Sequence, residues 1–97
     1  MRDSRLQSIA LVTGAGSPTG IGFAIARALG RAGHRIAITS TSARIEDRAH
    51  ELRADGIDAV GFAADLTDPE RVSTLVAEVG DVEILVNNAG MASLGVS

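Results

Sequence analysis

Four glycines gather between Thr13 and Gly22, and their spacing suits the binding of a phosphate group. The segment follows a short apolar run and precedes a stretch of helical periodicity, so it joins a strand to a helix. Because glycine has no Cβ, the backbone can turn tightly there and approach a pyrophosphate. The start of the following helix adds free N–H groups and a partial positive charge. We interpret the segment as a pyrophosphate-binding loop, with a plain strand-to-helix turn as the alternative.

Several reactive side chains are missing from the sequence. Its 97 residues contain no Cys, Tyr or Trp, and all nine basic residues are arginine. A Tyr or Lys proton donor, a thiolate nucleophile and a Cys-ligated metal are therefore excluded within this chain. His34 and His50 have no partners at ligand spacing, so we expect no metal site. The net charge of −3 and only two aromatic residues disfavour nucleic-acid binding.

The apolar positions predict one unit, strand-turn-helix, repeated along the chain. Nearly continuous apolar runs predict buried strands at 9–13, 35–39, 59–64 and 82–86. Between the strands, apolar residues recur three and four positions apart, as on one face of a helix. These faces are Ile21, Ile25, Ala28, Leu29 and Ala32; Ile45, Ala49 and Leu52; and Val72, Leu75, Val76 and Val79.

Particular residues predict where the three helices begin and end. Gly33 and Gly56 are expected to stop the first two helices. Thr67 with Glu70 three residues later fits a capping box at the start of the third helix, and Pro69 is tolerated in a first turn.

This order, β-α-β-α-β-α-β, predicts an α/β fold. Hydrophobic strands that alternate with helices favour a Rossmann-type, doubly wound parallel sheet with strand order 3-2-1-4. Such a sheet normally has a second half, whereas the chain stops at Ser97, soon after its fourth strand. We therefore expect residues 1–97 to form an incomplete nucleotide-binding domain with an open edge at the fourth strand.

Three motifs at predicted strand ends carry a family resemblance. They are Thr13-Gly14 with Gly20-Ile21-Gly22, Asp65-Leu66, and Asn87-Asn88-Ala89-Gly90. In this order and spacing they resemble the short-chain dehydrogenase/reductase family, and most closely its 3-oxoacyl-(acyl-carrier-protein)-reductase-like members. The likeness runs from about Ser8 to Gly90.

For the glycine loop, the resemblance implies contact with the pyrophosphate of a nicotinamide cofactor. The implied residues are Gly14, Gly16, Gly20, Ile21 and Gly22. In the family's glycine motif, three residues usually lie between the first and the second glycine, whereas here five residues lie between Gly14 and Gly20. We expect the extra residues to lengthen the loop, with Ser17 and Thr19 available to bond a phosphate or to cap the helix.

For the other two motifs, the resemblance implies contacts with the adenosine part of the cofactor and with its ribose. Asp65 would accept a hydrogen bond from the adenine amino group, and Leu66 would flank the ring. Asn88, Ala89 and Gly90 would line the ribose. A turn or capping carboxylate is the alternative for Asp65, and a purely structural tie between central strands is the alternative for Asn87.

The end of the second predicted strand indicates which cofactor is preferred. Recognition of the free ribose 2′-hydroxyl of NAD uses an Asp or Glu there, and none occurs before Glu46. Hydroxyl groups and an arginine favour a 2′-phosphate, so we predict Thr41 and Arg44 as its ligands and NADP(H) over NAD(H). The alternative for Arg44 is a solvated residue in the first turn of the second helix.

Family members assist hydride transfer with a Ser and a Tyr-x-x-x-Lys pair, in which Tyr gives the proton and Lys lowers its pKa. This chain has neither Tyr nor Lys, so we expect no catalytic residue in it and no turnover by it alone. The resemblance implies an NADP(H)-dependent oxidoreductase acting on a small carbonyl or hydroxyl substrate, present here as its cofactor-binding N-terminal part. The alternative is a truncated, non-catalytic module that binds a nucleotide or a partner.

The sequence also bears on location and assembly. The apolar run Ile9 to Val12 is too short for a signal peptide or a membrane span, and the absence of cysteine suits a reducing cytoplasm. We expect a cytoplasmic protein without membrane partners. The open sheet edge leads us to expect a homo-oligomer or dependence on a partner segment.

Overall fold

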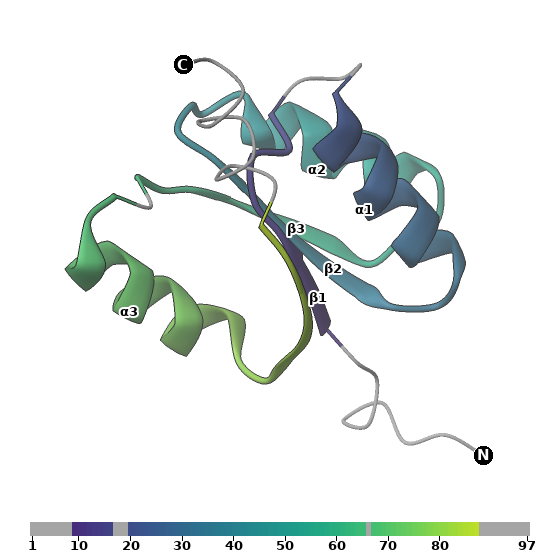
Figure 1. Ribbon diagram of the computed structural model, residues 1–97. Helices are drawn as coiled ribbons and strands as arrows, with labels where there is room; N and C mark the ends of the chain where they lie inside the picture. Colours follow the sequence, from purple (N-terminus) through teal and green to yellow (C-terminus); the bar gives the residue numbers. More distant parts are fainter. Residues whose placement is uncertain (1–8, 17–19, 66, 88–97) are drawn as a thin grey trace.

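A computed structural model describes residues 9–16, 20–65 and 67–87. Strands and helices alternate along this part of the chain, as predicted (Figure 1). The elements are β1 (Ile9–Val12), α1 (Ile21–Arg31), β2 (Arg35–Ser40), α2 (Ile45–Ala54), β3 (Ala59–Ala63), α3 (Pro69–Val79) and β4 (Val82–Val86).

The four strands form one parallel sheet with the order β3-β2-β1-β4. β1 pairs with β2 from Ile9 opposite Arg35 to Val12 opposite Ile38, and on its other side with β4. This arrangement confirms the predicted fold class and strand order. Because all strands run the same way, their carboxyl ends and the loops that follow them lie along one edge of the sheet.

One face of the sheet is covered by α1 and α2 (Figure 1). Side chains alternate along a strand, and Ala10, Val12, Ile36 and Ile38 on this face are at most 1% exposed. They form the hydrophobic core together with residues of the two helices: Phe23 and Ala26 from α1, and Ile45, Ala49 and Leu52 from α2. We call this side the packed face.

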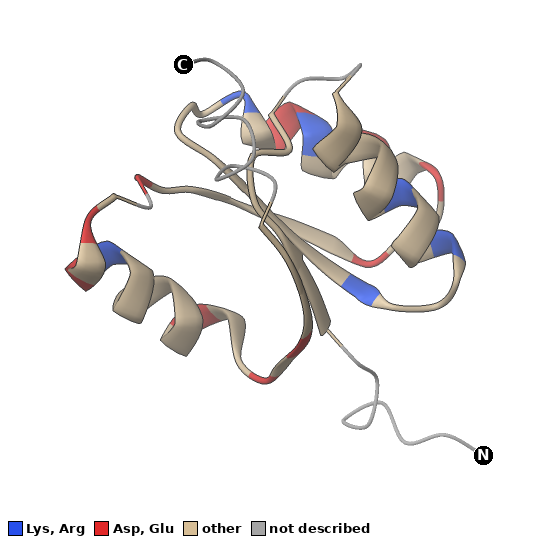
Figure 2. Ribbon diagram, viewed as in Figure 1, with Lys and Arg blue, Asp and Glu red and all other residues tan. Residues whose placement is uncertain are grey.

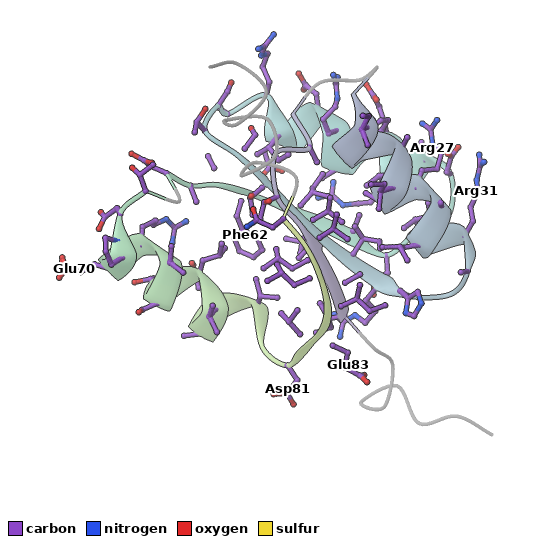
Figure 3. The ribbon with its side chains drawn as sticks, viewed as in Figure 1. Arg27, Arg31, Phe62, Glu70, Asp81 and Glu83 are labelled. Atoms are coloured by element: carbon purple, nitrogen blue, oxygen red, sulfur yellow. The ribbon has the colours of Figure 1, made fainter. Side chains whose placement is uncertain are left out.

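α1 carries arginines, and α2 carries arginines and acidic residues (Figure 2); the side chains of Arg27 and Arg31 point away from the sheet (Figure 3). The guanidinium of Arg27 lies 4.9 Å from the ring centroid of Phe23 and 3.1 Å from the Asp55 carboxylate. The Arg48 guanidinium approaches the same ring at 6.0 Å. Phe23 thus joins the core to the charged surface between the two helices through cation–π contacts.

The opposite face, which we call the open face, carries α3 alone among the described helices (Figure 1). Leu75 is the buried residue of α3 and is 2% exposed. Neighbouring apolar residues on this face are far more accessible: Val60 is 45% exposed, Val76 51% and Leu85 63%. The described part of the chain therefore packs its two faces very differently.

The helix ends follow most of the predicted signals. Gly33 and Gly56 come just after α1 and α2, with φ of 105° and 82°. The capping box predicted at Thr67 is wrong, because the cap of α3 is Asp68, whose Oδ1 accepts the Glu70 N–H at 3.0 Å. Pro69 then occupies the first helical position, and the Thr67 hydroxyl is bound elsewhere.

Candidate functional site

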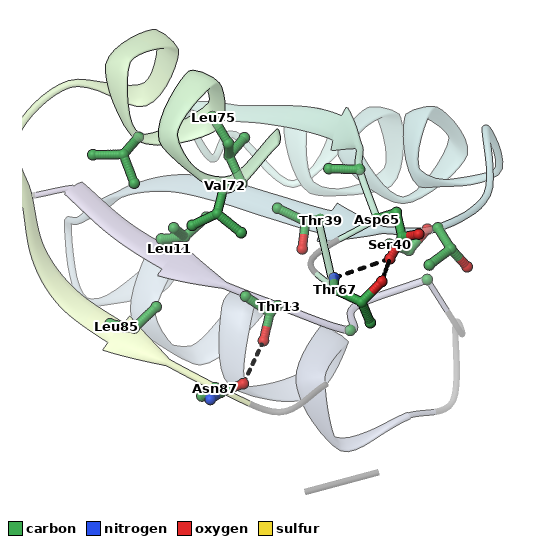
Figure 4. Close-up of a pocket in the computed structure, with 15 residues that line it drawn as sticks. Leu11, Thr13, Thr39, Ser40, Asp65, Thr67, Val72, Leu75, Leu85 and Asn87 are labelled. Carbon is green, nitrogen blue, oxygen red and sulfur yellow. Dashed lines mark hydrogen bonds between the residues drawn. The ribbon is translucent and has the colours of Figure 1, made fainter. Parts of the chain in front are cut away.

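A pocket of about 680 Å³ opens at the carboxyl ends of the strands and continues under α3 (Figure 4). Its rim is polar and comes from the loops that follow β1, β2, β3 and β4. Its floor is apolar and comes from the open face and α3. The floor residues are Leu11, Val72, Leu75, Val76 and Leu85. In open α/β sheets this edge is where ligands bind.

The glycine loop contributes Gly14 and Gly16 to the pocket wall. Gly14 has φ of 69°, a conformation that L side chains rarely adopt. At Gly16 a Cβ would stand 2.9 Å from Cβ of Ser40, so a larger residue could not fit without movement. The Ala15 N–H donates to the Thr39 carbonyl at 2.9 Å, which fixes the loop against β2.

The loop leads into the N-terminus of α1. Gly20 is the N-cap residue, and as a glycine it offers no side chain to cap the helix. The first turn also contains no acidic residue, so the positive end of the helix dipole has no side-chain anion of its own. Ile21 is exposed and Gly22 is buried in this turn. Ser17 and Thr19 lie outside the described residues.

At the end of β4, Asn87 meets the start of the glycine loop (Figure 4). The Thr13 hydroxyl lies 3.3 Å from the Val86 carbonyl, to which it donates, and 3.4 Å from Oδ1 of Asn87. The Thr13 N–H also donates to the Val86 carbonyl at 3.0 Å. Asn87 therefore lies beside the hydrogen bonds that link the end of β1 to the end of β4. The neighbouring candidates Asn88, Ala89 and Gly90 lie outside the described residues.

At the end of β3, the Asp65 carboxylate lines the pocket and belongs to a tight turn. Its Oδ1 accepts the Thr67 hydroxyl at 2.6 Å and the Thr67 N–H at 3.0 Å. The hydroxyl bond, and after it the N–H bond, lowers the pKa of Asp65 below its usual value. The side chain is thus an anion held in one orientation at the pocket rim. Leu66 lies outside the described residues.

The two predicted ligands of the 2′-phosphate, Thr41 and Arg44, both lie between β2 and α2, but only Thr41 lines the pocket. Thr41 is exposed and lines the pocket. Arg44 is exposed at the N-cap of α2 and is not among the pocket-lining residues. The first acidic side chains of this region, Glu46 and Asp47, come later, in the first turn of α2.

The pocket also includes polar residues that the sequence motifs did not single out. Ser40, Thr39 and Thr67 line it. The spacing Ser40-x-Ser42 and the spacing Asp65-x-Thr67 are typical of turns closed by a side-chain oxygen, and this signal was available in the sequence. No sequence motif indicates Thr39, because only the structure shows its environment. The residue is fully buried, and its Oγ1 has no hydrogen-bond partner in the described structure.

Metal-binding clusters and membrane spans are both absent from the described ranges. These ranges contain no group of His, Cys, Asp or Glu that could hold a metal ion. Among the same residues, no helix combines the length and the apolar character needed to cross a membrane.

Strand order, the glycine loop and a pocket at the strand ends define a Rossmann-type α/β protein. The family model described as short chain dehydrogenase matches residues 8–97, and the chain belongs to this family. Its membership confirms the resemblance seen in the three motifs.

Several known oxidoreductases are similar to the chain. Versicolorin reductase 1 of Aspergillus parasiticus is 41% identical over 93 residues, which cover 90% of this chain and 35% of that protein. The crystal structure of an actinorhodin polyketide ketoreductase variant with NADPH is 38% identical with a TM-score of 0.72, over 84% of this chain and 32% of that one. A metagenomic short-chain oxidoreductase in complex with NADP is 32% identical with a TM-score of 0.70, over 80% and 37%. The chain spans about a third of the length of the curated relatives it matches.

Proposed function

We propose that this chain is the cofactor-binding part of an NADP(H)-dependent oxidoreductase that acts on a carbonyl or hydroxyl substrate, similar to 3-oxoacyl-thioester reductases. The observation that carries the proposal is the N-terminus of α1, which has glycine at its N-cap and follows a glycine loop on the pocket wall. A phosphate group there would meet free N–H groups and the positive end of the helix dipole. Membership of the short-chain dehydrogenase family supports this reading.

The pyrophosphate is assigned to the glycine loop and the first turn of α1. Gly16 fits this role because its missing side chain lets the backbone lie against Ser40 at the pocket wall. Gly14, Gly20, Ile21 and Gly22 complete the assigned set, and Ser17 and Thr19 stay candidate phosphate ligands.

The adenine is assigned to the rim beside β3. Both turn bonds of Asp65 end on Oδ1, and we assign Oδ2 to the adenine amino group. An aspartate is ionised at neutral pH, and the hydrogen bonds from Thr67 lower the pKa of Asp65 further, so Oδ2 is a hydrogen-bond acceptor there. Leu66 is assigned to the adenine ring, and Asn88, Ala89 and Gly90 are assigned to the ribose.

The 2′-phosphate is assigned to the loop between β2 and α2. Thr41 supplies a hydroxyl on the pocket rim, and Arg44 supplies the cation. No acidic residue precedes Glu46 in this loop to repel the phosphate. A charge-assisted contact from a guanidinium contributes about 1.5–3 kcal/mol, which corresponds to roughly a tenfold to hundredfold preference for NADPH. The NADP and NADPH complexes among the similar structures support the same choice.

The bound nicotinamide supplies the hydride. This chain's own residues bind and orient the cofactor, and they include no Tyr or Lys to give a proton to the substrate. We therefore assign proton donation to residues outside these 97 positions. The same absence favours one alternative, a non-catalytic module that binds the nucleotide without turnover.

The test compares dissociation constants for NADPH and NADH in the protein at its full natural length. We expect NADPH to bind more tightly, and Arg44→Ala to remove most of the preference by weakening NADPH alone. Gly16→Ala should weaken both cofactors, because the new Cβ displaces the loop from Ser40. Equal affinities for the two cofactors, or an unchanged ratio in Arg44→Ala, would refute the assigned 2′-phosphate site.

A turnover assay separates the two candidate functions. NADPH oxidation with a 3-oxoacyl thioester by the protein at full natural length supports the reductase. Tight NADPH binding without oxidation of the cofactor, over a panel of ketone substrates, supports the non-catalytic module.

A further inference from the structure

Ser40 stands where the glycine loop meets the loop between β2 and α2. It is the last residue of β2, and its carbonyl accepts the Ala64 N–H at 2.8 Å, so its backbone is held by the sheet. Its side chain faces Gly16: a Cβ built on that glycine would lie 2.9 Å from Cβ and 3.0 Å from Oγ of Ser40. Both residues line the pocket. A shift of the Ser40 side chain would therefore displace both the glycine loop and the loop between β2 and α2.

The Ser40 hydroxyl begins a series of hydrogen bonds that reaches Arg44. Its Oγ donates to the Ser42 carbonyl at 3.0 Å and accepts the Ser42 N–H at 3.2 Å. The Ser42 hydroxyl in turn accepts the Arg44 N–H at 3.1 Å. The Ser42 carbonyl also accepts the Ile45 N–H, which starts the turn into α2. The series links a strand held by the sheet to the backbone that carries Arg44.

Thr41 is enclosed by this hydrogen-bonded turn. It lies between Ser40 and Ser42, and the Ser40 hydroxyl is hydrogen-bonded to both the N–H and the carbonyl of Ser42. Its own side chain is exposed on the pocket rim. An exposed loop residue keeps one orientation only when neighbouring bonds restrict its backbone. The Ser40 hydroxyl supplies that restriction for Thr41.

We propose that Ser40 is a positioning residue for cofactor selection: its hydroxyl holds the turn that presents Thr41 and Arg44 to the 2′-phosphate. This inference rests on the proposed function, since it concerns the same cofactor. Ser40 acts through the loop and makes no contact of its own with the phosphate. The removal of its hydroxyl should therefore affect NADPH and leave NADH binding as it is.

The experiment is a double-mutant cycle with Ser40→Ala and Arg44→Ala in the protein at its full natural length. Ser40→Ala keeps the Cβ that packs on Gly16 and removes only the hydroxyl. We expect it to raise the dissociation constant of NADPH roughly threefold to tenfold, as for the loss of one hydrogen bond, and to leave that of NADH unchanged. In the double variant the two losses should not multiply, because the Ser40 hydroxyl acts through Arg44 and its loop. Ser73→Ala, which removes an exposed hydroxyl from α3 away from the pocket, is the control.

Amide hydrogen exchange provides a readout without nucleotide. In Ser40→Ala the amides of Ser42 and Arg44 should exchange faster, while those of β1 and β2 keep their protection. Unchanged exchange at Ser42 would overturn the inference, as would equal weakening of NADPH and NADH, or fully multiplicative losses in the cycle. If Arg44→Ala leaves the NADPH to NADH ratio unchanged, the proposed 2′-phosphate site fails and this inference fails with it. If Arg44→Ala lowers the ratio and Ser40→Ala does not, only the role of Ser40 is refuted.

Discussion

The two faces of the sheet are built from the same strands and show opposite degrees of packing. On the packed face, Ile36, Ile38 and Leu52 have at most 1% of their surface exposed. On the open face, Val76 and Leu85 are more than half exposed, and both line the pocket. Strand hydrophobicity alone thus does not determine burial, which depends on what the rest of the chain places against each face. Stability resides on one side, and the ligand pocket on the other.

The comparison is tested most strongly by the same substitution on each face. In the 97-residue chain, Leu52→Ala should lower the free energy of unfolding by about 2–5 kcal/mol, since it leaves a cavity in a filled core. Leu85→Ala should change it by no more than about 0.5 kcal/mol, since most of that side chain is in water. Urea unfolding measures both. Equal losses would show that the open face is packed in solution.

A second substitution asks whether α3 is held by its single buried residue. Leu75→Ala should cost about 2 kcal/mol, and the loss should be confined to α3. Amide exchange in α3 should accelerate, whereas amides in β1 and β2 keep their protection. Acceleration throughout the sheet would mean that the two faces unfold together.

Thr39 near the end of β2 and Thr13 just after β1 should respond to substitution with opposite signs. Thr39→Val removes a buried hydroxyl without a partner in the described structure, so we expect the free energy of unfolding to rise by about 1 kcal/mol. Thr13→Val removes a hydroxyl that bonds the end of β4, so a fall of about 1 kcal/mol is expected. Thermal unfolding of both variants decides this. A loss in Thr39→Val would reveal a partner for that hydroxyl.

The smallest expected effect concerns the pH response of the pocket rim. The Thr67 hydroxyl is the main cause of the lowered pKa of Asp65, so Thr67→Val should raise that pKa toward its usual value in an NMR titration. Because the folded-state pKa lies below the unfolded one, the stabilisation from this carboxylate is present above the unfolded pKa. It is lost as the pH falls through the folded pKa. An unchanged pKa in the variant would assign the shift to another group.

The fold could be predicted because its signals are periodic. The apolar runs of β1 and β2 and the helical stripe that includes Ile25 and Leu29 depend only on spacing, and the strand order follows from parallel crossovers. Helix ends were less certain: Thr67 and Asp68 both suit a cap, and the choice depends on the bond between Thr67 and Asp65.

The sequence predicted where the candidate site lies, but it predicted only some of the residues that line it. Gly14, Gly16, Thr41 and Asp65 line the pocket, as a motif at a strand end allows. The contribution of Ser40 depends on side-chain hydrogen bonds two residues apart and on a close approach to Gly16. The spacing of Ser40 and Ser42 indicates the local turn bond, but the approach to Gly16 cannot be deduced from a motif, because it requires the relative placement of two loops that are distant in sequence.

The contact between Gly16 and Ser40 also affects how this sequence can vary. A Cβ at position 16 would meet the Ser40 side chain, so a larger residue at 16 must be matched by a smaller or displaced residue at position 40. Substitutions at 16 and 40 should therefore be correlated in any set of functional variants, although the two positions lie 24 apart in the sequence. A library that varies position 16 alone would therefore sample mostly obstructed loops, whereas joint variation with position 40 allows side chains at 16 that Ser40 blocks.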